Sequence, residues 1–144
     1  MDAPQLNTQV IPAGPLRLPD LKLQAGPREI EFEVELPKGA EWDLAGENEI
    51  TIVSSVPEVA SPGQSRFNES AMVFYVPISG LRSGETILTY DIKLAWVEKS
   101  GEKCTDQRQV VQRLYVEASR GATVPWVHYK AMCNGTSSAT SGGT

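Results

Sequence analysis

The sequence predicts an all-β domain in which two antiparallel sheets pack face to face as a β-sandwich of about seven strands. Short segments alternate between apolar and polar residues at a period of two, which is the period of a half-buried strand. The 10 prolines and 12 glycines interrupt the chain too often for long helices. No window shows the apolar spacing of an amphipathic helix, so a parallel sheet with helical crossovers is not expected.

The first half of the chain supplies several of these strands. Leucines within residues 16–23 offer one or two short strands, interrupted by Pro19. Residues 29–36 alternate strictly, which places four apolar side chains on one face and four glutamates on the other. A turn signal at 37–39 ends that strand, and residues 50–53 form the next one. We expect the glutamates to form a solvated face, with basic residues of a neighbouring strand opposite them, rather than a cation site.

The second half contains the longest strands. Residues 72–78 are largely apolar, and Pro77 predicts that this strand lies at an edge or ends there. In residues 88–96, large hydrophobic residues alternate with small or polar ones. The last of the large residues is Trp96, which we therefore place in the core. The segment 99–102 is typical of a hairpin loop, which leads into a return strand over 110–116.

One domain over residues 16–131 accounts for the patterned part of the chain. We expect residues 1–15 to form an N-terminal extension and residues 132–144, which are rich in Gly, Ser and Thr, to form a flexible tail. Two unpatterned ends around a patterned centre indicate a module of a larger protein.

The charge balance excludes some partners. The chain carries 18 acidic and 13 basic residues, a net charge of -5, so nucleic acid and anionic membrane surfaces are not expected to bind it. No apolar run approaches the ~20 residues of a spanning helix. We expect a monomer whose partner is a neighbouring domain of the same polypeptide or another protein.

Residues that could support catalysis are few. His128 is the only histidine, and the sequence contains no Gly-x-Ser-x-Gly elbow and no phosphate-binding glycine loop. We assign His128 no role and predict no enzyme activity, no cofactor and no metal site. Cys104 and Cys133 are the only cysteines; they either form a disulfide or remain two separate thiols, and both alternatives stay open.

The aromatic residues offer another kind of site. Exposed tryptophans could stack against sugar rings, although most aromatic positions here alternate with core positions. A last apolar stretch over 124–129 adds a strand or packs across one end of the domain. Within it, Trp126 and Tyr129 are the candidates for contact with a ligand or partner.

The order of segments also resembles a known family. The run 30–39 ends in Leu36-Pro37-Lys38-Gly39, and 76–80 is followed by Gly84, a long strand over 88–97, Cys104 and the return strand. This layout resembles the immunoglobulin-like N-terminal domain of the bacterial transmembrane thiol-disulfide interchange protein. It is also similar to the C-terminal module of thioredoxin-like proteins with NHL repeats, and this likeness is closer. The resemblance covers residues 16–118 and implies an immunoglobulin-like fold.

In the redox-active members of that family, two cysteines flank the hairpin. Cys104 matches the second of these positions, but the first falls near Val97 or Glu98, where this chain has no cysteine. We therefore expect a non-catalytic accessory or interaction domain. The alternatives are a thiol-disulfide redox module that uses Cys104 with Cys133, and a carbohydrate-binding sandwich.

Overall fold

The structure is a computed structural model that describes residues 10–11, 16–68, 70–71, 73–117 and 125–133. In this part of the chain the regular structure consists of strands, and no helix is formed. Consequently, none of the described segments is a helix long and apolar enough to cross a membrane. The all-β prediction is confirmed.

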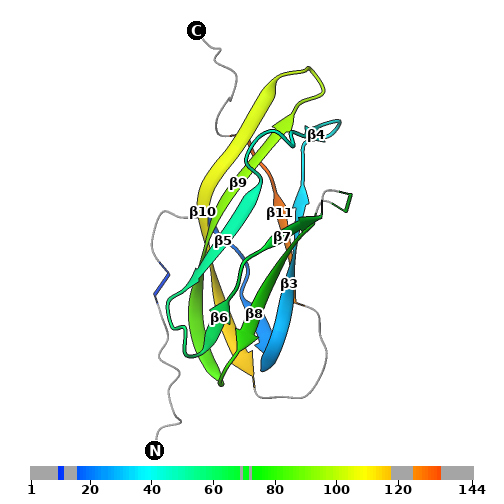
Figure 1. The fold of residues 1–144 in the computed structure, drawn as a ribbon. Coiled ribbons are helices and arrows are strands. Elements are labelled where there is room, and N and C mark those ends of the chain that lie inside the picture. Colours follow the sequence, from blue (N-terminus) through cyan, green and yellow to red (C-terminus); the bar gives the residue numbers. More distant parts are fainter. Residues whose placement is uncertain (1–9, 12–15, 69, 72, 118–124, 134–144) are drawn as a thin grey trace, which may run out of the picture.

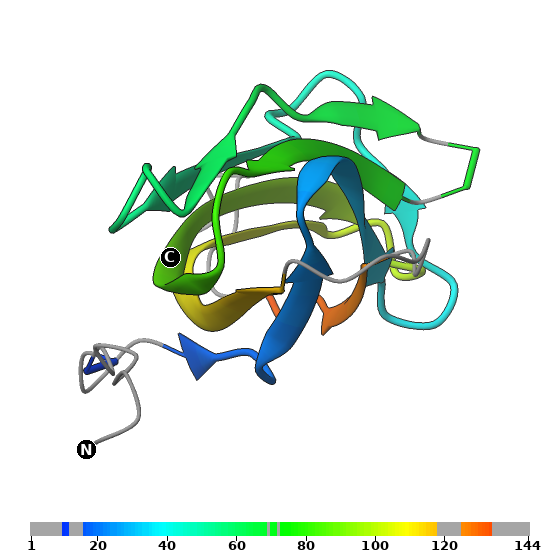
Figure 2. The same ribbon diagram turned by 90° about the horizontal axis from the view of Figure 1, so that it is seen from below.

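The strands form two sheets whose inner faces meet, as Figures 1 and 2 show. The first, here called the β9–β10 sheet, contains β1 (Leu16–Arg17), β2 (Leu21–Gln24), β4 (Glu41–Trp42), β5 (Glu49–Ser54), β9 (Gly84–Val97) and β10 (Lys103–Glu117). The second, here called the β3–β8 sheet, contains β3 (Gly26–Glu35), β6 (Ala60–Pro62), β7 (Arg66–Asn68), β8 (Val73–Gly80) and β11 (Trp126–Lys130).

The hairpin of β9 and β10 is the longest element of the fold. The two strands pair antiparallel over their length, and β5 and β4 pair with the other edge of β9. In the connecting loop, Glu98 N donates to Glu102 O at 2.7 Å, and Gly101 has a φ of 92° that favours glycine. The hairpin predicted around residues 99–102 is confirmed.

Both sheets are mixed, so the prediction of purely antiparallel sheets is wrong at their edges. β1 and β2 run parallel to β10. On the other sheet, β11 runs parallel to β3 (Figure 1). Period-two alternation shows which face of a strand is buried, but it does not show the direction of the neighbouring strand. The described residues contain eleven strand segments, whereas about seven strands were predicted. The additional segments are short: Pro19 separates β1 from β2, and β4, β6 and β7 have only two or three residues each.

Pro77 lies in a strand that has neighbours on both sides, which differs from the predicted edge position. β3 pairs with one side of β8, while β6 and β7 pair with different parts of the other side. Pro77 falls between those two short pairings, and its carbonyl accepts a hydrogen bond from Gly63 N at 2.8 Å. The nitrogen of a strand residue points to the same side as its carbonyl, so the missing N–H faces a gap in the pairing.

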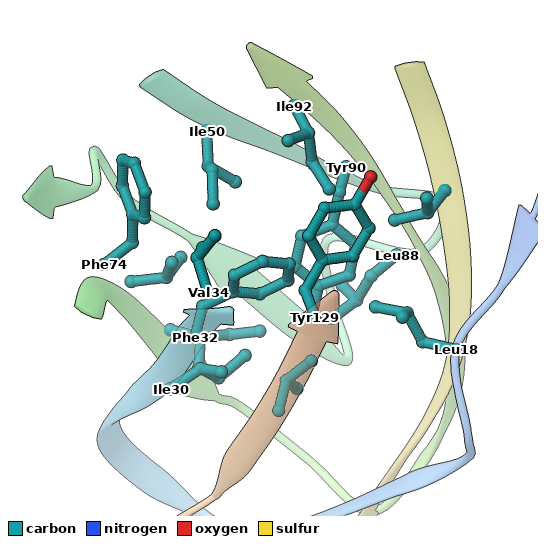
Figure 3. Packing of buried hydrophobic residues seen from close by; sticks show 14 of the residues in the cluster. Leu18, Ile30, Phe32, Val34, Ile50, Phe74, Leu88, Tyr90, Ile92 and Tyr129 are labelled. Atoms are coloured by element: carbon teal, nitrogen blue, oxygen red, sulfur yellow. The ribbon is translucent and has the colours of Figure 1, made fainter. Parts of the chain in front are cut away.

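The hydrophobic core fills the space between the sheets. The alternating apolar sets predicted for residues 30–36, 88–96 and 110–116 are buried, and Trp96 is 0% exposed. The ring of Phe32 on β3 lies 5.4 Å from Tyr90 on β9 and 5.6 Å from Tyr129 on β11. Figure 3 shows these rings pointing toward one another between the sheets. The face assignments of the long strands are therefore confirmed.

The strands extend from Leu16 to Lys130, within the range predicted for the domain. Of the predicted N-terminal extension, residues 1–15, only Val10 and Ile11 are among the described residues. Of the predicted tail, Met132 and Cys133 are described and contact the domain, and residues 134–144 lie outside the described part.

Candidate functional site

The outward side chains of β11 form the first candidate site. Along β11, Trp126, His128 and Lys130 are exposed, whereas Val127 and Tyr129 are buried. Tyr129 was predicted to share a surface contact with Trp126, but it is only 2% exposed. The two residues are an odd number of positions apart, and successive side chains of a strand point to opposite faces.

Trp126 is the exposed indole of this protein. Its side chain is 55% exposed, and its ring stacks on the ring of His128 with the centroids 5.9 Å apart. His128 Nε2 lies 3.0 Å from Glu35 Oε1, so the imidazole is positioned between an indole and a carboxylate. Trp96 is fully buried, and Trp42 packs edge-on against Phe67 at 4.9 Å. A platform of three exposed tryptophans is therefore not formed.

The glutamates of β3 border Trp126. Register pairs Trp126 with Glu31 and His128 with Glu33, and Glu35 follows on the same face. We call this surface, formed by Trp126, His128, Glu31, Glu33 and Glu35, the Trp126 face. A surface cavity of about 380 Å³ at one end is lined by Glu33, Glu35 and His128 together with the turn after β3.

Basic residues lie on both sides of the glutamate row, and on the neighbouring strand β11 Lys130 pairs in register with Glu35, as expected. Arg66 Nη2 on β7 lies 3.3 Å from Glu29 Oε2, and its guanidinium lies 4.5 Å from the centre of the Tyr75 ring. Within the described ranges, no group of three or more His, Cys, Asp or Glu side chains has an arrangement that could hold a metal ion. The Trp126 face thus combines an aromatic centre with an acidic border.

A second candidate site lies where β11 meets the other sheet. Asp106 on β10 is 0% exposed, and its carboxylate accepts hydrogen bonds from Tyr129 Oη at 2.7 Å and from Met132 N at 2.9 Å. Arg108 Nε donates to the same carboxylate at 2.6 Å, and Arg108 Nη2 donates to Met132 O at 3.2 Å. We call Asp106, Arg108, Tyr129 and Met132 the Asp106 cluster.

The Asp106 cluster keeps Tyr129 in its neutral form. Burial, together with the hydrogen bond to Asp106, raises the pKa of the Tyr129 phenol well above its usual range. The phenol therefore remains a hydrogen-bond donor, which suits the acceptor-only carboxylate beside it. This pairing holds the end of β11 against β10.

The two cysteines meet beside this cluster. Cys104 is 4% exposed and belongs to the core, whereas Cys133 is exposed. The thiols are in hydrogen-bond contact, and neither belongs to a disulfide in this structure. Burial, followed by the contact with Cys133, raises the pKa of Cys104 to about 12. The structure thus places the two thiols in contact, whereas the sequence left open whether they pair.

Asp106 was not among the residues predicted to form a site, although the sequence contains a signal for it. Alternation along β10 puts Cys104, Asp106, Arg108, Val110 and Gln112 on the inward face. Charged residues in an inward row are rare unless they are paired. Asp106 and Arg108 in this row therefore indicate a buried polar cluster near the start of β10, next to the hairpin loop.

Comparisons with known protein families and with curated proteins find no match for this chain. The resemblance to the interchange protein and to the NHL-associated module therefore stays a prediction.

Proposed function

We propose that this chain is a non-catalytic, immunoglobulin-like accessory domain of a larger protein that binds a protein partner through the Trp126 face. The exposed indole of Trp126, stacked on His128, is the observation that carries this proposal. A neighbouring domain of the same polypeptide is the leading partner. The order of segments, which resembles that of accessory modules of thioredoxin-like proteins, supports this assignment.

The composition of the Trp126 face is typical of a binding surface. Tryptophan, tyrosine and arginine dominate the residues that contribute most to protein interfaces, because a large rigid ring buries much area and loses little conformational freedom. Trp126 is held by the stacked ring of His128, and β11 is fixed at its far end by the Asp106 cluster. The indole is therefore presented on a rigid strand.

The acidic border defines the complementary partner. Glu31 pairs with Trp126, Glu33 with His128 and Glu35 with Lys130, so the carboxylates form a row along β11 in which one lysine stands at the end away from the indole. The chain as a whole carries a net charge of -5. A surface with an apolar pocket for the indole and a border of Lys or Arg matches this arrangement. Such charge complementarity affects mainly the association rate and the choice of partner.

Site-specific crosslinking tests this proposal. A photoreactive amino acid placed at 128 in the intact parent protein should crosslink to a defined partner segment, while the same group at Val53, exposed on β5 of the other sheet, should not. The captured segment is then titrated against the wild type, Trp126→Ala and Val53→Ala. We expect Trp126→Ala to weaken binding about 30-fold, equivalent to ~2 kcal/mol, and Val53→Ala to leave it unchanged. Equal affinity of both variants would exclude the Trp126 face.

Carbohydrate binding is the second candidate function. It is favoured by the same exposed indole and by the nearby cavity that Glu33 and Glu35 line. Sugar rings stack on aromatic faces, and carboxylates accept hydrogen bonds from sugar hydroxyls. Titration of a panel of oligosaccharides while the fluorescence of Trp126 is followed distinguishes the two. Saturable binding that Trp126→Ala abolishes would favour the carbohydrate function, and no response across the panel would favour the protein partner.

A further inference from the structure

Cys104 and Cys133 belong to elements that join only in the folded chain. Cys104 lies on β10 of one sheet, and Cys133 follows β11 of the other sheet by three residues. Their thiols nevertheless reach hydrogen-bond contact. Disulfide formation requires these sulfur atoms to approach from hydrogen-bond contact to about 2 Å.

The backbone on the N-terminal side of Cys133 is fixed by several independent hydrogen bonds. Ala131 N donates to Glu35 O at 2.9 Å, and Met132 N donates to the Asp106 carboxylate at 2.9 Å. Arg108 Nη2 donates to Met132 O at 3.2 Å. The fold therefore imposes the approach of Cys133 to Cys104, which does not depend on the two side chains alone.

We propose that Cys104 and Cys133 form an intramolecular disulfide by exchange with an external low-molecular-weight disulfide, and that this bond covalently links the end of β11 to β10. This inference concerns a different surface and is independent of the binding role of the Trp126 face. The bond would secure the strand that carries Trp126. It differs from the redox pair of the resembled family, since one partner lies beyond the region of resemblance.

The reaction proceeds by two exchange steps. The thiolate of Cys133 attacks one sulfur of the external disulfide, whose S–S bond breaks and whose other half leaves as a thiolate. The thiolate of Cys104 then attacks Cys133 Sγ in this mixed disulfide, and the second half of the reagent leaves. The two cysteine thiols lose two protons and two electrons, and the electrons reduce the external disulfide to two thiols.

Exposure determines the order of these steps. Cys133 is exposed and meets the reagent first, whereas Cys104 is buried in the core. Burial is the largest cause of the raised pKa of Cys104 and persists in the mixed disulfide, so its thiolate remains scarce at neutral pH. The second step is therefore the slower one, and its rate rises as the pH rises.

The bond should raise the stability of the domain. It closes a loop of about 30 residues that contains the crossing between the sheets and all of β11, which restricts the unfolded chain. For a domain of this size, we expect the melting temperature to rise by about 10 °C. Reduction should return it to the starting value.

Incubation of the full chain with oxidised glutathione at about pH 8, followed by mass spectrometry and peptide mapping, tests the proposal. The wild type should lose two hydrogens, retain no glutathione and show a Cys104–Cys133 peptide. Cys104→Ala should retain one glutathione on Cys133, because no second thiol can displace it. Cys133→Ala, a surface change, should remain unmodified and show no rise in melting temperature on oxidation.

Two results would overturn the proposal. The wild type could retain glutathione on Cys133 to the same extent as Cys104→Ala, which would show that Cys104 does not reach the mixed disulfide. Pairs of chains linked through Cys133 would instead show that this thiol reacts between molecules. If Cys104→Ala does not fold, the wild-type peptide map and the Cys133→Ala control still decide between these outcomes.

Discussion

Replacing Asp106 by alanine should destabilise the domain more than the loss of an ordinary surface charge. The carboxylate is fully buried and accepts hydrogen bonds from Tyr129, Met132 and Arg108. Its removal leaves the buried Tyr129 hydroxyl and the Met132 amide without this acceptor, at about 1–3 kcal/mol each. Arg108 is partly exposed and can be hydrated. The two losses sum to about 2–6 kcal/mol. The desolvation cost that the carboxylate no longer incurs reduces the expected loss to about 2–4 kcal/mol.

Urea denaturation followed by circular dichroism measures this loss. With an unfolding slope of roughly 2 kcal/mol per molar urea, the midpoint should fall by about 1–2 M in Asp106→Ala. Tyr129→Phe removes one donor and should cost about 1 kcal/mol. The matched control is Glu117→Ala on the same strand, whose exposed carboxylate lies 3.9 Å from Lys22 Nζ, and it should cost under ~0.5 kcal/mol. Similar midpoints for Asp106→Ala and Glu117→Ala would refute the role of the Asp106 cluster.

Two further predictions concern the core and its response to pH. Trp96→Ala removes a fully buried indole and should cost ~3–5 kcal/mol, whereas Glu33→Ala on the outer face should cost under ~0.5 kcal/mol; equally mild denaturation curves would contradict the core placement. Burial raises the pKa values of Tyr90, Tyr129 and Cys104 in the folded chain, so the unfolded chain loses these protons first as the pH rises. The contribution of these groups to the free energy of unfolding should be fully present below about pH 9. Above that pH, the free energy of unfolding should fall by up to ~1.4 kcal/mol per pH unit for each such group. Melting temperatures between pH 7 and 11 that stay constant above pH 9 would contradict this prediction.

The buried faces of the long strands could be predicted, because the buried face of a strand follows from the period-two pattern of its own residues. Ile30, Phe32 and Trp96 occupy inward positions of period-two segments, and the structure buries all three. The direction of β11 could not be predicted, because it depends on how the chain crosses between sheets after β10. A short apolar stretch such as 124–129 carries no information about that crossing.

The candidate sites were predicted only in part. Trp126 is exposed as the aromatic stretch suggested, yet its predicted companion Tyr129 points inward, which strict alternation along β11 already implies. The contact of Cys104 with Cys133 lies beside the hydrogen bonds of Asp106 with Tyr129 and Met132, which are 23 and 26 residues further along the chain. Long-range hydrogen bonds of this kind leave no local pattern beyond a charged residue in an inward row.

The pairing of β11 with β3 joins a strand near the beginning of the domain to the last one. A ribosome releases β3 early and β11 only when the domain is almost complete, so one edge of β3 remains without its neighbour during most of synthesis. Contacts between segments so distant in sequence close slowly, because a long loop must be ordered before they form. We therefore expect the β9–β10 hairpin to form first and the docking of β11 to complete the fold, which makes the uncovered edge of β3 the position where nascent chains are most open to mispairing.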